Sequence, residues 1–125
     1  MNTQKKKILV VDDSKTAMHI VTTILKKAPY ELVTAHDGQQ AIEMAVAEHP
    51  DLILMDVVMP RKTGFEACRE LKHRDDTKSI PVILVTTRGE EQNVETGFES
   101  GCNDYVTKPV NAQELLAKVR DYIAS

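Results

Sequence analysis

The stretch PDLILMDVVMP, residues 50–60, decides the fold class of this chain. Its apolar residues 52–55 form an unbroken run, which is typical of a strand buried on both faces of a parallel sheet. The run ends in a carboxylate, Asp56, and a Met-Pro turn follows. Because ligands of such sheets lie beyond the carboxyl ends of the strands, a buried strand that ends in an acid points to a functional site at that edge.

Short apolar segments of the same kind recur along the chain, and each closes near polar residues: KILVVDD (7–13), DLILMD (51–56), PVILVTT (81–87), DYVTKP (104–109) and, more weakly, ELVTA (31–35). The stretches between them carry apolar residues at helical spacing, as residues 41–46 do. Ser14 and Asn111 are suited to begin the first and last helices, and Gly101 to end the fourth. This alternation predicts an α/β domain with a five-stranded parallel sheet and helices on both faces.

Length and composition indicate one soluble globular domain. The chain has 125 residues, of which 42% are hydrophobic and 28% are charged. We therefore expect a single domain over residues 1–125, with residues 1–6 as a flexible N-terminal tail and no separate output domain. The formal net charge of −3 argues against direct nucleic-acid binding. Since no apolar stretch approaches the length that spans a bilayer, we expect a cytoplasmic protein without a membrane segment.

The two cysteines, Cys68 and Cys102, lie in sequence contexts that look helical. They lack the paired spacing of a zinc site or of a redox motif. We expect both to be reduced thiols packed in the interior.

Four of the five expected strands end in residues that are able to do chemistry: Asp12 and Asp13, Asp56, Thr86, and Lys108. In a parallel sheet these residues meet at one edge. Two unit charges roughly 4 Å apart interact by about 4 kcal/mol at an effective dielectric of about 20, so three carboxylates there need positive charge beside them. Lys108 supplies part of it. A divalent cation supplies the rest, and Mg²⁺ is favoured over Zn²⁺ because no His or Cys accompanies the acids.

A metal ion, a lysine, a hydroxyl and a free carboxylate are the parts needed for phosphoryl transfer to an acidic side chain. An ionised carboxylate is already a nucleophile and needs no general base. The pattern therefore favours Asp56 as the acceptor, with the Asp12–Asp13 pair as its partner in metal binding and Thr86 as a hydrogen-bond donor to the phosphoryl group.

These residues closely resemble the receiver domain of two-component response regulators, the CheY-like family, over essentially the whole chain. The matching pieces, in order, are LVVDDS, DLILMDVVMP, GFE, PVILVTT and GCNDYVTKP. The resemblance implies a flavodoxin-like sheet with the strand order 2-1-3-4-5. It also implies a phosphorylation switch rather than an enzyme, one that promotes only its own phosphorylation and dephosphorylation.

The resemblance assigns a role to each site residue. Asp56 is the phospho-acceptor, and Lys108 contacts the phosphoryl group. Asp12, Asp13 and Asp56 bind Mg²⁺, for which Mn²⁺ can substitute, and the main-chain carbonyl of Val58 completes the metal site.

The resemblance also implies a switch that leads away from the site. The hydroxyl of Thr86 moves toward the phosphoryl group, and the ring of Tyr105 swings inward. This movement remodels the face made by the fourth helix, the fifth strand and the fifth helix, where a downstream target docks. The Lys108–Pro109 peptide bond is expected to be cis.

Two features depart from the commonest pattern of the family. Thr87 stands where a very small residue is usual, and the family varies the positions of Val58 and Arg88. These three residues are expected to tune access to Asp56.

The predicted function is to accept a phosphoryl group from a histidine kinase or a phosphotransfer protein and then to bind a target. Homodimerisation on activation is left open. One alternative is a haloacid-dehalogenase-type phosphatase, although its D-x-D motif and cap are missing from the sequence. A second is a flavodoxin-like FMN carrier, which the acids after the first strand disfavour. A third is a receiver-like interaction module that works without phosphorylation.

Overall fold

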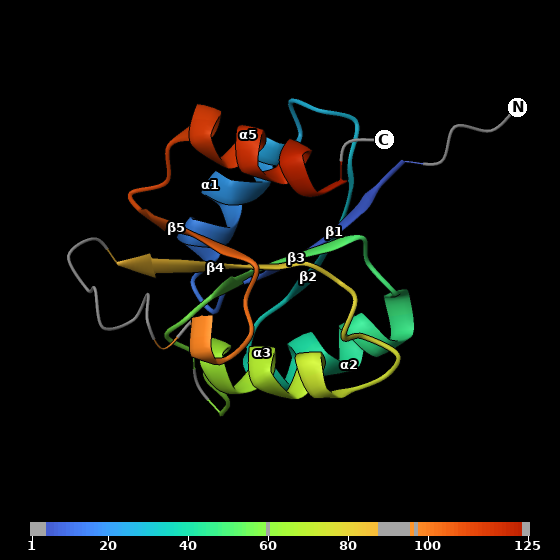
Figure 1. Cartoon of the computed structure of the whole chain (residues 1–125). Coiled ribbons are helices and arrows are strands. Elements are labelled where there is room, and N and C mark those ends of the chain that lie inside the picture. Colours follow the sequence, from blue (N-terminus) through green and yellow to red (C-terminus); the bar gives the residue numbers. More distant parts are fainter. Residues whose placement is uncertain (1–4, 60, 88–95, 97, 124–125) are drawn as a thin grey trace, which may run out of the picture.

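The computed structural model describes residues 5–59, 61–87, 96 and 98–123 (Figure 1). The helices and strands follow in the order β1 (Lys7–Val11), α1 (Lys15–Leu25), β2 (Glu31–Ala35), α2 (Gly38–Glu48), β3 (Leu52–Asp56), α3 (Gly64–His73), β4 (Val82–Thr87), β5 (Asp104–Lys108) and α5 (Ala112–Ile123). Most of the predicted fourth helix and residues 1–4 of the predicted tail lie outside the described residues. Within the described part of the chain, no helix is long and apolar enough to cross a membrane.

The five strands form one parallel sheet in the order β2-β1-β3-β4-β5. Helices α1 and α5 cover one face, and α2 and α3 cover the other (Figure 1). The predicted fold class, strand order and two-sided helical cover are therefore confirmed. All five residues of the central strand β3 are buried, which is why its sequence is apolar up to Asp56.

The core is divided into two layers by the sheet, because successive side chains of a strand point to opposite faces. The layer under α2 and α3 takes one set of residues from β1 and β3: Leu9, Val11, Ile53 and Met55. The layer under α1 and α5 takes the alternate set: Ile8, Val10, Leu52 and Leu54. Two-sided burial thus requires the continuous apolar run from which the parallel sheet was predicted.

Side-chain caps begin the helices where the sequence predicted them. The hydroxyl of Ser14 accepts from the N–H of Ala17 at 3.2 Å, and the side chain of Asn111 accepts from the N–H of Glu114 at 2.9 Å. Caps of this kind stabilise a helix by about 1 kcal/mol. Gly101 has φ +96°, the left-handed conformation that ends a helix, and it follows the helical residues 98–99.

Both cysteines are buried free thiols, as expected. The helical context predicted for Cys102 is wrong, however, because this residue lies between Gly101 and β5, where the left-handed glycine has already turned the chain. Cys68 lies within α3. Burial raises the pKa of both thiols, and it raises the pKa of Cys102 to about 11.

Candidate functional site

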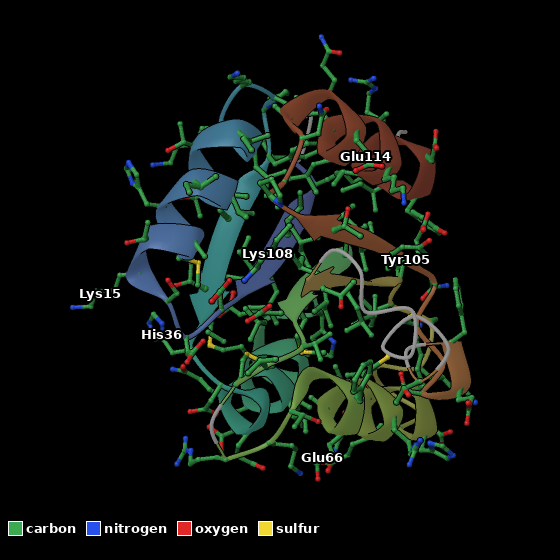
Figure 2. The ribbon with its side chains drawn as sticks, turned by 90° about the vertical axis from the view of Figure 1, so that its left-hand side faces the viewer. Lys15, His36, Glu66, Tyr105, Lys108 and Glu114 are labelled. Carbon is green, nitrogen blue, oxygen red and sulfur yellow. The ribbon has the colours of Figure 1, made fainter. Side chains whose placement is uncertain are left out.

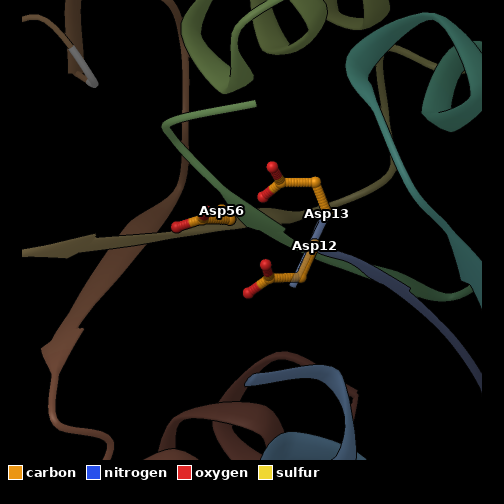
Figure 3. Close-up of side chains that lie close together, drawn as sticks. All are labelled: Asp12, Asp13 and Asp56. Atoms are coloured by element: carbon orange, nitrogen blue, oxygen red, sulfur yellow. The ribbon is translucent and has the colours of Figure 1, made fainter. Parts of the chain in front are cut away.

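The acids after β1 and at the end of β3 meet at the carboxyl edge of the sheet. Val11, the last residue of β1, pairs with Met55, so Asp12 emerges beside Asp56. Oxygens of Asp12, Asp13 and Asp56 all lie within 4.8 Å of one another (Figure 3). We call these three residues the acidic cluster. The sequence prediction that acids separated by two helix–strand units are neighbours in space is confirmed.

Lys108 reaches the acidic cluster from the end of β5, although β4 lies between β5 and β3. Its ammonium nitrogen Nζ is 3.1 Å from Oδ1 of Asp56 and 3.6 Å from Oδ2 of Asp12. Figure 2 shows Lys108 at this edge of the sheet, with Tyr105 farther back along the same strand. A long, flexible side chain at the end of β5 therefore brings one positive charge between two of the carboxylates.

The charges of the site are only partly balanced. Asp12 and Asp56 are buried, while Asp13 is exposed. Burial raises the pKa of the Asp56 carboxyl, and the charge of Asp12 raises it further, while Lys108 opposes both. Burial alone would lower the pKa of Lys108, but Asp56 and Asp12 outweigh it and raise that pKa. Among the described residues, one ammonium beside three carboxylates leaves the cluster short of positive charge.

This ligand set fits a hard divalent cation. The acidic cluster offers oxygen ligands, and no Cys or His belongs to it among the described residues. Oxygen ligands from one or two carboxylates are typical of Mg²⁺ sites that also hold phosphate oxygens, whereas Zn²⁺ sites in proteins use Cys or His. One carboxylate oxygen of Asp12, Oδ1, also accepts a hydrogen bond from the N–H of Ser14 at 2.9 Å.

The other predicted site residues lie on the strands and loops around the cluster. Thr86 is buried near the end of β4, one residue beyond Val85, which pairs with Asp56. Val58 lies two residues beyond Asp56, and its side chain is exposed. Thr87 is the last residue of β4 and pairs with Lys108, but its side chain is not described. Arg88 lies outside the described residues.

Tyr105 is half-buried on β5, at a distance from the acidic cluster. Its ring meets the ring of Phe98 edge-on with 5.9 Å between centroids, and Nζ of Lys118 lies 5.0 Å from its centroid. Lys118 belongs to α5 and Phe98 to the helical residues 98–99, so two different elements contact this ring. At the other end of the strand, the Lys108–Pro109 peptide bond is cis, as the resemblance implied.

Close packing between the end of β3 and the start of α3 fixes the position of Asp56, and the sequence analysis missed it. A Cβ atom on Gly64, the first residue of α3, would lie 2.3 Å from the carbonyl oxygen of Asp56, so only glycine fits there. The N–H of Gly64 also donates to the carbonyl oxygen of Val57 at 2.9 Å. The signal was present as T-x-x-E at residues 63–66, which forms a capping box at the start of α3.

Comparison with known proteins identifies the family. The family model of the response regulator receiver domain matches residues 8–120. Protein PilH of Pseudomonas aeruginosa is 41% identical over 118 residues, which are 94% of this chain and 98% of PilH. The protein named "Probable transcriptional regulator ycf27" of Cyanophora paradoxa is 42% identical over 123 residues, 98% of this chain but 50% of that protein. The chain thus spans about half the length of this relative.

A solved structure shows the same fold with a metal ion in it. The receiver domain of the sensor histidine kinase PA1611 from Pseudomonas aeruginosa PAO1 has a magnesium ion coordinated in its active-site cleft. It matches this structure with a TM-score of 0.90 at 29% identity, covering 98% of this chain and 100% of that chain. With the family model matched across residues 8–120, the chain belongs to the receiver domains of two-component response regulators.

Proposed function

We propose that this receiver domain accepts a phosphoryl group on Asp56, from the phosphohistidine of a histidine kinase or a phosphotransfer protein, and then binds a downstream target. The observation that carries the proposal is the position of Lys108, whose ammonium lies 3.1 Å from a carboxylate oxygen of the buried Asp56. A carboxylate held beside a fixed positive charge is an ionised nucleophile that needs no general base.

The proposed transfer forms one bond and breaks another. A carboxylate oxygen of Asp56 bonds to the phosphorus while the P–N bond to the donor histidine breaks, and the leaving imidazole keeps the electron pair. Lys108 offsets charge on the oxygens of the transferring group. The hydroxyl of Thr86, which follows the strand neighbour of Asp56, donates a hydrogen bond to one of these oxygens.

We propose that the acidic cluster binds Mg²⁺ and that Mn²⁺, which prefers similar ligands, can replace it. Asp12, Asp13 and Asp56 would supply carboxylate oxygens, and Val58 its main-chain carbonyl. When bound, the ion neutralises charge on the cluster and on the transferring phosphoryl group. The shortage of positive charge around the cluster and the magnesium ion in the PA1611 receiver domain support this proposal.

Thr86 and Tyr105 are the residues that we propose to carry the signal to the surface. They lie on neighbouring strands, where Leu84 pairs with Tyr105 and Thr86 with Thr107. Phosphorylation would shift a pre-existing equilibrium between outward and inward positions of the Tyr105 ring. The proposed docking face consists of β5, α5 and the fourth-helix segment, and it would take either a target protein or a second copy of this chain.

The residues proposed to tune access to Asp56 are Thr87, Val58 and Arg88. The proposal for Val58 is supported by its position two residues beyond the buried Asp56 and by the exposure of its side chain. Thr87 would act from the last position of β4, and Arg88 lies outside the described residues.

We propose a switch protein rather than an enzyme that acts on external substrates. A haloacid-dehalogenase-type phosphatase carries its nucleophile in a D-x-D motif after the first strand, whereas Asp12 and Asp13 are adjacent. The formal net charge of −3 favours protein partners over nucleic acid. We place the reaction in the cytoplasm, where ATP-dependent kinases make phosphohistidine.

Intact-mass spectrometry after incubation with acetyl phosphate and Mg²⁺ tests the assignment of Asp56. The wild type is expected to gain the mass of one phosphoryl group, and Asp56→Asn is expected to gain none because an amide is not a nucleophile. Asp75→Asn is the matched control, since the side chain of Asp75 is 99% exposed and lies outside the acidic cluster, so it should label like the wild type. An unlabelled wild type or a labelled Asp56→Asn variant would contradict the assignment.

A further inference from the structure

The loop that joins β3 to α3 contains a residue in a costly backbone conformation. Among the described residues other than glycine, positive φ angles occur at His49 (φ +47°) and Arg61 (φ +67°). His49 ends α2, where a left-handed residue is usual. Arg61 ends no helix, and its Cβ makes this conformation unfavourable. Strain of this kind persists only where the surroundings enforce it, and it is common beside functional sites.

The side chain of Arg61 is bound to the start of α2. Its Nη2 and Nε donate to Oδ2 of Asp37 at 2.8 and 3.2 Å. The other carboxylate oxygen of Asp37 accepts from the N–H of Gln40 at 2.7 Å and so caps α2. This hydrogen bond from Gln40 lowers the pKa of Asp37, and Arg61 lowers it further. Asp37 is thereby fixed in one rotamer, and it fixes Arg61 in turn.

The backbone next to Arg61 is seated on the same helix. A Cβ atom on Gly38, the first residue of α2, would lie 2.2 Å from the carbonyl oxygen of Lys62, so the loop approaches α2 as closely as a glycine allows. The ammonium of Lys62 also lies 2.7 Å from Oε1 of Glu70 on α3. The C-terminal half of the loop is therefore held by α2 and α3 together.

Val58 lies in the other half of the same loop, between Asp56 and the anchored residues. The metal ligand proposed for Val58 is its main-chain carbonyl, which no rotamer change can aim, so its position depends on the loop backbone alone. The loop begins at Asp56, where Gly64 packs, and its far half is fixed through Arg61. A change at Arg61 would thus reach the carbonyl of Val58 through the backbone.

We infer that the Asp37–Arg61 ion pair is a positioning clamp for the metal site: it holds the β3–α3 loop in the conformation that presents the carbonyl of Val58 to Mg²⁺. Neither residue belongs to the acidic cluster, and both act through the backbone of the loop. The inference rests on the metal site of the proposed function. It adds two positioning residues that none of the matching sequence motifs contains.

Isothermal titration calorimetry with Mg²⁺ tests the clamp. Arg61→Asn removes the ion pair but tolerates the left-handed conformation, and Asp37→Asn keeps the helix cap while removing the charge. Each variant is expected to bind Mg²⁺ about fivefold more weakly, less than the roughly 10- to 100-fold loss typical of direct outer-shell partners, because Arg61 is partly exposed to solvent. The double variant should bind no more weakly than either single variant, because both break the same contact.

The control is Arg74→Ala, which breaks an exposed arginine–aspartate pair with Asp76 outside the β3–α3 loop. The Arg74→Ala variant should bind Mg²⁺ with wild-type affinity. In the absence of Mg²⁺, the Arg61→Asn variant should unfold thermally at a midpoint close to that of the wild type. Unchanged Mg²⁺ affinity in Arg61→Asn, or an equal loss in Arg74→Ala, would overturn the clamp but leave the metal site standing. If the wild type bound no Mg²⁺, the metal site would fall and the clamp with it.

Discussion

Two aspartate–lysine pairs of this domain have the same separation but opposite surroundings. Lys108 lies 3.1 Å from Asp56 at the carboxyl edge of the sheet, and Lys118 lies 3.1 Å from Asp104 where α5 packs beside β5. The side chain of Asp56 is 9% exposed and has two further carboxylates beside it. The side chain of Asp104 is 27% exposed, and its charge is matched by one lysine.

The difference supports the proposal that charge balance, rather than the geometry of the pair, distinguishes the phosphorylation site from a structural ion pair. The ammonium of Lys118 makes several contacts within its own pair. It donates to Asp104 and to the carbonyl oxygen of Tyr105, and it also lies over the tyrosine ring. Lys108 is shared between two acids and satisfies neither completely. A site with unmet negative charge attracts a metal ion, and a balanced pair holds two elements together.

Replacing each lysine by methionine should give the largest difference between the two pairs, measured as the rate of phosphorylation of Asp56. Lys108→Met is expected to slow phosphorylation of Asp56 by acetyl phosphate about 100-fold, the effect of removing one donor that stabilises charge in a transition state. Lys118→Met should change this rate less than about twofold, because an ion pair open to solvent contributes little and its partners lie outside the acidic cluster. Initial rates of mass labelling at saturating Mg²⁺ measure both effects. Equal slowing in the two variants would remove the distinction between the pairs.

Much of the fold was predictable because two-sided burial leaves a direct trace in the sequence. The continuous apolar runs of β1, β3 and β4 admit one interpretation, and the observed strands agree with the predicted segments to within two residues. The acidic cluster was also predictable, since parallel strands bring their carboxyl ends to one edge, where Asp12 and Asp13 follow β1 and Asp56 ends β3.

The contacts that fix the site were not predictable from local pattern. The Asp37–Arg61 pair depends on a left-handed residue and on the close approach of two backbones at Gly38, neither of which has a periodic signature. The error at Cys102 has another cause, because the sequence did predict that Gly101 ends the fourth helix and Cys102 follows that glycine. Close approach between distant segments depends on the whole fold, whereas periodicity reports only burial.

Replacing each aspartate by asparagine should change stability in opposite directions in the absence of Mg²⁺. Asp56→Asn is expected to raise the free energy of unfolding by about 1 kcal/mol, because it removes a buried charge that Asp12 repels. Asp104→Asn is expected to lower it by about 0.5 kcal/mol, because it breaks a partly exposed balanced pair. Urea unfolding at pH 7 with a chelator measures both changes. Destabilisation of both variants would show that Lys108 already balances the acidic cluster.

The gain in stability from Asp56→Asn should fade as the pH falls, and Asp104→Asn provides the comparison. Burial, with the charge of Asp12, raises the pKa of Asp56 above 3.8 in the folded protein, so the folded state binds this proton more tightly than the unfolded state. Well below pH 3.8 the Asp56 carboxyl is protonated in both the folded and the unfolded state, so the folded wild type does not carry the cost of a buried charge. As the pH rises through the folded-state pKa, the carboxylate ionises and its destabilising effect becomes complete. Urea unfolding of the wild type and of the Asp56→Asn variant, carried out from acidic to neutral pH, measures the gain in stability at each pH. A gain that did not change with pH would contradict the prediction.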